Sequence, residues 1–227
     1  MATMFNGAYT ILDKDGSYFA VYGTGPGEDK LVAIADFGDP VKVVVFWADA
    51  IPADFAQKSG TKSRRIADQV SVRMGSRGTI ESSFVGFGNG FVAYNQTPPH
   101  PIVEDGPAAA FTSMLTLGVT RPAPTGMEKF VWNKAERKLA SVWVDRSVPM
   151  LVTVPTYNLP TQSLYIAGAR DGVFGVYQLD WETGRQTGYI DLGRSHKFNV
   201  LAGLAVPFGE GRVWLTGAYG PVFVRVR

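Results

Sequence analysis

The chain contains no cysteine and only two histidines among its 227 residues. The lack of cysteine excludes disulfide bonds, thiolate metal sites and a cysteine nucleophile. No run reaches the ~18 consecutive apolar residues that a membrane-spanning helix needs, and the first ten residues, MATMFNGAYT, show no charged segment followed by an apolar one. We therefore expect a soluble protein without a visible signal peptide, whose location in the cell the sequence leaves open.

An excess of charge of one sign is also missing, because the formal net charge is only +2. The basic residues are scattered apart from residues 62–65 (KSRR), a short cluster that is typical of a solvated loop. Such a distribution lacks the electrostatic footprint of a nucleic-acid-binding protein. We expect neither a nucleic acid nor a membrane as a partner.

Glycine, proline and aromatic residues are plentiful, with 26 Gly, 14 Pro and 12% aromatic residues. Glycine and proline interrupt the chain too often for long helices, and aromatic residues beside Val, Ile or Thr favour strands. Apolar and polar residues alternate in many short runs. Between these runs lie dipeptides that are typical of tight hairpin turns: Asp15-Gly16, Asn89-Gly90, Asp171-Gly172 and Glu210-Gly211.

The short strands recur in units. Residues 149–193 form the clearest unit, with four short strands separated by polar turns, and residues 16–74, 78–146 and 197–227 repeat the scheme. Four-stranded units of roughly 45 residues are typical of β-propeller blades. We predict a single all-β domain, a β-propeller-type array of about four four-stranded antiparallel blades, with a β-sandwich as the alternative.

The last unit ends after its third predicted strand, at Arg227. Propellers often complete the final sheet with a strand from the other terminus, which removes an exposed sheet edge. Residues 8–12 are a candidate for that strand; alternatively, they are the outer strand of a blade that this sequence does not contain.

Four stretches, in order, resemble a known group of proteins. They are residues 32–46 (VAIADFGDPVKVVVF), 78–95 (GTIESSFVGFGNGFVAYN), 179–185 (LDWETGR) and 198–220 (FNVLAGLAVPFGEGRVWLTGAYG). Together they resemble the C-terminal half of bacterial β-propeller proteins near the gluconolactonase/calcium-dependent phosphotriesterase superfamily and near quinoprotein-like propellers. The resemblance covers residues 30–227 and implies a β-propeller fold whose N-terminal half this chain lacks.

In metal-binding members of that superfamily, a Glu and several Asn or Asp side chains bind Ca²⁺ in the central tunnel. The resemblance implies Glu81, Asn199 and Asn158 as metal ligands, with Asp39 as a further candidate. Calcium takes six to eight oxygen ligands, chiefly carboxylates, amide carbonyls and water. The alternative is that Glu81 and Asn199 bind each other, or backbone groups, through tunnel water.

Two functional hypotheses remain. In the first, the chain is a ligand-binding or scaffold propeller without catalysis, or a truncated relative of one, with a small-molecule ligand at the tunnel mouth. In the second, it is a calcium-dependent hydrolase of a lactone or ester, with His196 as general base. No GxSxG motif signals a Ser-His-Asp triad. A homodimer, or a missing N-terminal half, would complete the ring of blades. The fold alone does not distinguish between the two functional hypotheses.

Overall fold

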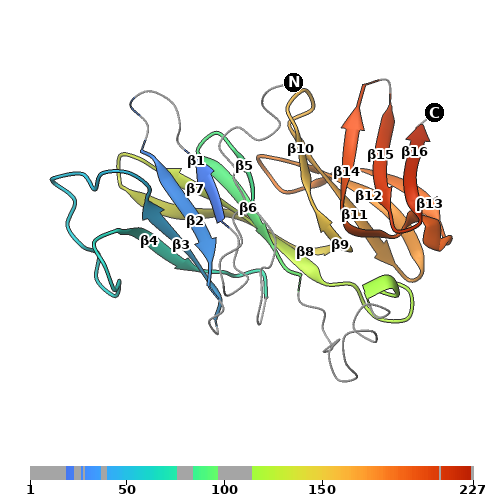
Figure 1. Ribbon diagram of the computed structural model, residues 1–227, viewed down its shortest axis with the longest axis horizontal. Helices are drawn as coiled ribbons and strands as arrows, with labels where there is room; N and C mark the ends of the chain where they lie inside the picture. The colour runs from blue at the N-terminus through green and yellow to red at the C-terminus, as the bar shows by residue number, and fades with distance from the viewer. Residues whose placement is uncertain are drawn as a thin grey trace. The chain divides into compact units, whose positions relative to one another are not determined.

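The computed structural model describes residues 19–22, 27, 29–36, 40–75, 84–96, 114–209 and 211–225. The chain folds as two compact units, one made of Met1–Asn95 and Met127–Val144 and the other of Gln96–Gly126 and Asp145–Arg227. Within the described ranges, the strands assemble into four sheets of four strands each (Figure 1). No helix in these ranges is long and apolar enough to cross a membrane.

The first unit is built on two sheets, in each of which every strand pairs with the next one in the chain. The strands of the first sheet are β1 (Phe19–Tyr22), β2 (Leu31–Ala35), β3 (Lys42–Trp47) and β4 (Ile66–Ser71). Those of the second sheet are β5 (Val85–Phe87), β6 (Gly90–Tyr94), β7 (Thr125–Asn133) and β8 (Lys138–Pro149).

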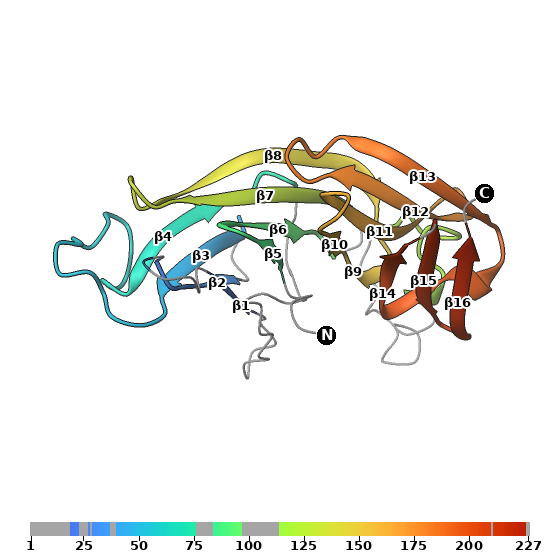
Figure 2. The ribbon, with the colours of Figure 1, turned by 90° about the horizontal axis from the view of Figure 1, so that it is seen from above.

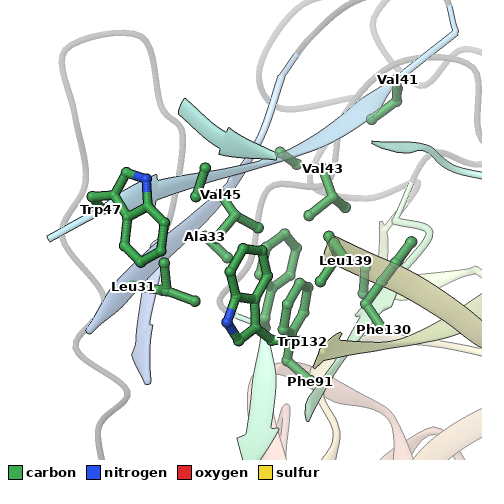
Figure 3. Close-up of a cluster of buried hydrophobic side chains, with 14 of the residues drawn as sticks. Leu31, Ala33, Val41, Val43, Val45, Trp47, Phe91, Phe130, Trp132 and Leu139 are labelled. Carbon is green, nitrogen blue, oxygen red and sulfur yellow. The ribbon is translucent and has the colours of Figure 1, made fainter. Parts of the chain in front are cut away.

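Alternating side chains of these strands make the core of the first unit (Figure 3). Along β3, Val43 and Val45 are fully buried and Trp47 is nearly so, as the two-residue period of a strand requires. The Trp47 ring meets Trp132 of β7 edge to face, with ring centroids 5.8 Å apart. Phe91 of β6 stacks on Phe130, its partner in β7 of the same sheet, at 5.6 Å. The contact of Trp47 with Trp132 joins the faces of the two sheets in one core.

The second unit also contains two sheets. One has the order β10-β11-β12-β13, and the other has the order β16-β15-β14-β9. The strands of the first of these are β10 (Thr156–Asn158), β11 (Ser163–Arg170), β12 (Val173–Asp180) and β13 (Gln186–Gly193). The other contains β9 (Val152–Val154), β14 (Val200–Phe208), β15 (Arg212–Gly217) and β16 (Gly220–Arg225), and the 3-10 turn η1 (His196–Phe198) precedes β14.

The order of the strands decides the fold class. Three of the four sheets are simple meanders, in which neighbours in the sheet are neighbours in the chain. A β-sandwich of the immunoglobulin type would instead connect its strands as a Greek key. The all-β, propeller-type array of four four-stranded sheets is therefore confirmed.

The fourth sheet corrects one detail of the predicted strands. The sequence pattern predicts residues 151–155 as a single strand of the third blade, but the structure divides this stretch. Val152–Val154 runs parallel to β14 in the fourth sheet, and Thr156–Asn158 pairs with β11 in the third. The fourth strand of this sheet is thus β9, beside β14, while the candidate strand at residues 8–12 lies outside the described residues.

Candidate functional site

His196 and Asn199 lie together in the connection between β13 and β14. The backbone there makes one tight turn, in which the N–H of Phe198 donates to the carbonyl of Ser195 and the N–H of Asn199 donates to the carbonyl of His196, both at 3.0 Å. Two of the residues that the sequence singled out are therefore neighbours in the structure, and the turn fixes their backbone.

Asn199 is almost fully buried, with 1% of its surface exposed. Its side-chain amide donates to the carbonyl of Leu115 at 2.6 Å, and its own backbone carbonyl accepts from the N–H of Ala218 at 2.7 Å. Buried polar groups require such partners. Asn199 thereby ties the segment before β7 and the turn between β15 and β16 to η1, and one of the two N–H groups of its side chain is already used.

His196 is exposed, and its ring lies edge-on to the buried ring of Phe174, with centroids 5.7 Å apart. The ammonium group of Lys197 sits 4.7 Å from the ring centroid of Phe198, which is the geometry of a cation–π contact. Both polar side chains thus stand on aromatic supports while they face solvent.

The neighbouring turn between β11 and β12 belongs to the same surface. Asp171 and Gly172 both have positive φ, 53° and 77°, as the predicted Asp-Gly hairpin turn requires. The guanidinium of Arg194 donates to the backbone carbonyl of Asp171 at 2.9 Å, and the N–H of Gly172 donates to the carbonyl of Gly118 at 2.7 Å. The first bond joins the turn to the chain that leads into η1, and the second joins it to the segment before β7.

We call this region the loop surface and define it by the exposed residues Arg170, Asp171, Arg194, Ser195, His196, Lys197, Ala218 and Tyr219. It carries three exposed cations, Arg170, Arg194 and Lys197, against one carboxylate, that of Asp171. The exposed carboxylate of Asp191 adjoins it, since Asp191 acts on Tyr177 together with Arg170 and Asp171. The Tyr219 side chain, at the β15–β16 turn, is 73% exposed. Such a surface suits an anionic ligand, because guanidinium and ammonium groups donate strong hydrogen bonds to carboxylates and phosphates.

Asn158 lies at the opposite end of the third sheet from the loop surface. Its side-chain oxygen accepts from the N–H of Thr161 at 3.1 Å and from the hydroxyl of Thr161 at 2.9 Å, which closes the turn between β10 and β11. Asn158 pairs with Ser163 at the start of β11, whereas the Asp171 turn follows the end of that strand. Strands rise about 3.3 Å per residue, so the eight-residue β11 separates the two ends by about 23 Å. The structure does not bring Asn158 to Asn199.

The remaining residues of the predicted site, Glu81 and Asp39, lie outside the described residues. Among the residues that are described, no group of three or more His, Asp or Glu side chains is placed to hold a metal ion. The predicted calcium site therefore stays a prediction.

The sequence analysis did not single out a buried polar cluster in the first unit. Glu128 of β7 is fully buried, and its carboxylate accepts from the backbone N–H of Arg73 at 2.5 Å and from the Ser141 hydroxyl at 2.5 Å. The Arg73 side chain completes the cluster, with Nε 3.3 Å from Glu128 and Nη2 donating to Ser141 at 2.6 Å. The signal in the sequence is the charged pair Glu128-Lys129 inside an otherwise apolar strand.

A second buried carboxylate works in the same way. Asp68 of β4 accepts from the backbone N–H of Leu139 in β8 at 2.7 Å, and its other oxygen lies 3.1 Å from the ammonium of Lys58. Both clusters link the last strand of the first sheet, or the residues just after it, to β7 and β8 of the second. In both clusters a buried carboxylate accepts hydrogen bonds that connect the two sheets of the first unit, so its hydrogen-bonding requirement is met.

No known family model matches the chain. A protein of Archaeoglobus fulgidus that is described as uncharacterized is 33% identical over 171 residues, which cover 73% of this chain and 33% of that protein. The chain thus spans about a third of the length of the curated relative it matches.

Two solved structures align with most of the chain. BamB from Moraxella catarrhalis aligns with a TM-score of 0.45 and 12% identity, over 96% of this chain and 63% of that one. Sqt1 of Saccharomyces cerevisiae aligns with a TM-score of 0.44 and 10% identity, over 93% and 57%. The resemblance to the gluconolactonase/calcium-dependent phosphotriesterase superfamily stays a prediction.

Proposed function

We propose that the chain is a β-propeller-type binding module without catalysis of its own, and that its loop surface binds an anionic ligand. The observation that supports this is the way the exposed cations are held. Lys197 and His196 stand on aromatic rings, and Arg194 is anchored on the Asp171 turn. Binding residues commonly lie on loops that a rigid scaffold positions.

The supports lower the cost of binding. A flexible side chain loses about 0.5–1.5 kcal/mol of conformational freedom when a ligand immobilises it. The contact of Arg194 with the Asp171 carbonyl, and that of Lys197 with the Phe198 ring, restrict these side chains before a ligand arrives. The buried amide of Asn199 holds the backbone beneath them. The ligand therefore meets a surface that is largely pre-organised.

A fluorescent octaglutamate peptide is a suitable probe for this surface, with binding followed by anisotropy at low salt. Replacing Arg194 and Lys197 by Gln should weaken binding at least tenfold, because each loses a charge-assisted contact. The matched control replaces Arg185, in the β12–β13 turn, and Arg225, at the end of β16, which are exposed cations at the opposite ends of their sheets from the loop surface. If both double variants bind equally, or if the wild-type chain does not bind the peptide, the proposed ligand class is wrong.

The calcium-dependent lactonase or esterase remains a second candidate, favoured by the placement of His196 beside Asn199. In that proposal Glu81 and Asn199 hold Ca²⁺ and His196 acts as general base. A calcium titration of the melting temperature tests it directly: calcium should raise the melting temperature of the wild-type chain but not of Glu81→Gln. No calcium-dependent shift in either protein would eliminate this candidate.

A further inference from the structure

The turn between β15 and β16 places an aromatic ring on the loop surface, among its cations. The side chain of Tyr219 is 73% exposed there, between the small residues Ala218 and Gly220. A tyrosine ring offers a large and rigid contact area, and a ligand that stacks on it restricts only two side-chain torsions. An exposed ring at a loop tip is therefore well suited to contact a planar part of a ligand.

The backbone of this turn is fixed to η1. The N–H of Ala218 donates to the carbonyl of Asn199 at 2.7 Å, and a Cβ added at Gly217 would lie 2.7 Å from the carbonyl oxygen of Lys197. Only glycine permits so close an approach of two backbones. The end of β15 lies beside the start of β14, which follows η1 directly, and Figure 2 shows these strands side by side.

The ring and the cations lie within the span of one small ligand. Tyr219 follows Gly217 by two residues, and consecutive Cα atoms are about 3.8 Å apart, so its Cα lies within about 12 Å of the Lys197 carbonyl. Arg194 precedes Lys197 by three residues and is likewise exposed. A ligand with a ring and an anionic group a few bonds apart can therefore contact Tyr219 and the cations together.

Carboxylates beside the cations restrict the kind of anion that fits. The side chain of Asp171 is exposed on the loop surface, and that of Asp191 adjoins it. One oxygen of Asp191 accepts from the N–H of Gly193 at 2.7 Å. Carboxylates repel a plain anion, but they accept strong hydrogen bonds from hydroxyl groups. The mixed charge therefore favours a ligand that carries hydroxyl donors as well as an anionic group.

We propose that the anionic ligand of the loop surface is a nucleoside phosphate. The base stacks on the ring of Tyr219, the phosphate accepts hydrogen bonds from Arg194 and Lys197, and the ribose hydroxyls donate to the Asp171 carboxylate. This class of ligand combines the planar ring, the anionic group and the hydroxyl donors that the surface selects. The inference rests on the proposed function, because the phosphate uses the same cations.

NMR titration of the ¹⁵N-labelled chain measures the contribution of each part of the ligand. Adenosine 5′-monophosphate and ribose 5-phosphate share the phosphate and differ in the base. The nucleotide should bind with a Kd at least about fivefold lower, which is the lower end of what the stacking of a base on an aromatic side chain contributes. 2′,3′-Dideoxyadenosine 5′-monophosphate lacks the hydroxyl donors and should bind at least about threefold more weakly than adenosine 5′-monophosphate.

Variants of the ring test the assignment of the base. Tyr219→Ala should remove the advantage of adenosine 5′-monophosphate over ribose 5-phosphate, whereas Tyr219→Phe keeps a ring and should retain it. The matched control is Phe223→Ala, which removes another aromatic side chain, 72% exposed and four residues farther along the chain, and should retain the advantage. Octaglutamate should bind Tyr219→Ala as it binds the wild-type chain, which also shows that the variant is folded.

The outcomes separate this inference from the proposed function. Equal affinity of the wild-type chain for adenosine 5′-monophosphate and ribose 5-phosphate, or an advantage that persists in Tyr219→Ala, would overturn the nucleoside phosphate and leave the anion-binding surface in place. Equal affinity for the two nucleotides would also overturn it, because any aromatic anion would then fit as well. A wild-type chain that does not bind octaglutamate contradicts the proposed function itself.

Discussion

The hydroxyl of Ser141 is expected to contribute strongly to the stability of the first unit, although Ser141 is only partly buried. It donates to the carboxylate of Glu128 at 2.5 Å and accepts from the guanidinium of Arg73 at 2.6 Å. In Ser141→Ala, the fully buried carboxylate loses a donor that water cannot easily replace. The Arg73 side chain is 59% exposed, so water replaces its lost hydrogen bond to Ser141 and this loss costs little free energy.

The magnitude follows from the kind of bond that is lost. A hydrogen bond to a charged group contributes about 1.5–3 kcal/mol, so we expect Ser141→Ala to lower the free energy of unfolding by about 2 kcal/mol. Glu128→Gln keeps the size of the side chain but removes the charge, and we expect it to lower the free energy of unfolding by about 2–3 kcal/mol. Breaking a fully buried ion pair typically costs about 3–5 kcal/mol, and the loss here is smaller because Arg73 is exposed. The double variant should lose less than the sum by about 1 kcal/mol, since both changes break the same bond.

Urea unfolding followed by tryptophan fluorescence measures these differences. Ser195→Ala is the control, because Ser195 is exposed and its side chain makes no capping bond to η1. Such a surface change should stay within about 0.5 kcal/mol of the wild type. A loss below about 0.5 kcal/mol for Ser141→Ala, or strictly additive effects in the double variant, would refute the view that the hydroxyl stabilises the buried carboxylate.

Two further predictions concern the second unit. A Cβ added at Gly203 would collide with the Thr216 side chain, so Gly203→Ala should lower the free energy of unfolding, measured in urea, by about 2 kcal/mol. Gly209→Ala is the control, because nothing lies within 4 Å of a Cβ added there. Equal losses of stability in the two variants would contradict the steric explanation. Burial raises the pKa of Tyr177 and of Tyr189, whose rings pack at 4.9 Å. A raised tyrosine pKa means that the stabilisation is fully present below pH about 10 and is lost as the pH rises through the folded-state pKa. The melting temperature should therefore fall above pH about 10, less steeply in Tyr189→Phe, and parallel curves for the two proteins would argue against it.

The local features of the fold could be predicted from the sequence. The positive φ angles of Asp171 and Gly172 appear where the Asp-Gly dipeptide predicts a tight turn, since these residues adopt that conformation at low cost. The apolar run of β3 likewise predicts a buried strand, in which Val43, Val45 and Trp47 contribute to the core of the first unit. Both features depend on neighbours in the chain, which is why they could be read without the structure.

The candidate site was predictable only in part. The polar turn before β14 drew attention to His196 and Asn199, but nothing in the sequence shows that the Asn199 amide binds Leu115, 84 positions earlier. The family resemblance implied Asn158 as a metal ligand together with Asn199. Its role is local, because it closes a turn with Thr161 at the far end of its sheet.

By itself, the sequence determined the secondary structure class, the Asp171-Gly172 turn and the recurrence of short strands in groups, because these depend on side-chain periodicity and local backbone preference. Only the tertiary structure decided which sheet each short strand joins, as the parallel pairing of Val152–Val154 with β14 shows. It also decided that Glu128 is satisfied by Arg73 and Ser141, and that Phe223 is left in solvent. Burial and long-range pairing are properties of the packed chain. Residues with the same local pattern therefore lie in the core, in a hydrogen-bonded cluster between two sheets, or on a solvent-exposed face.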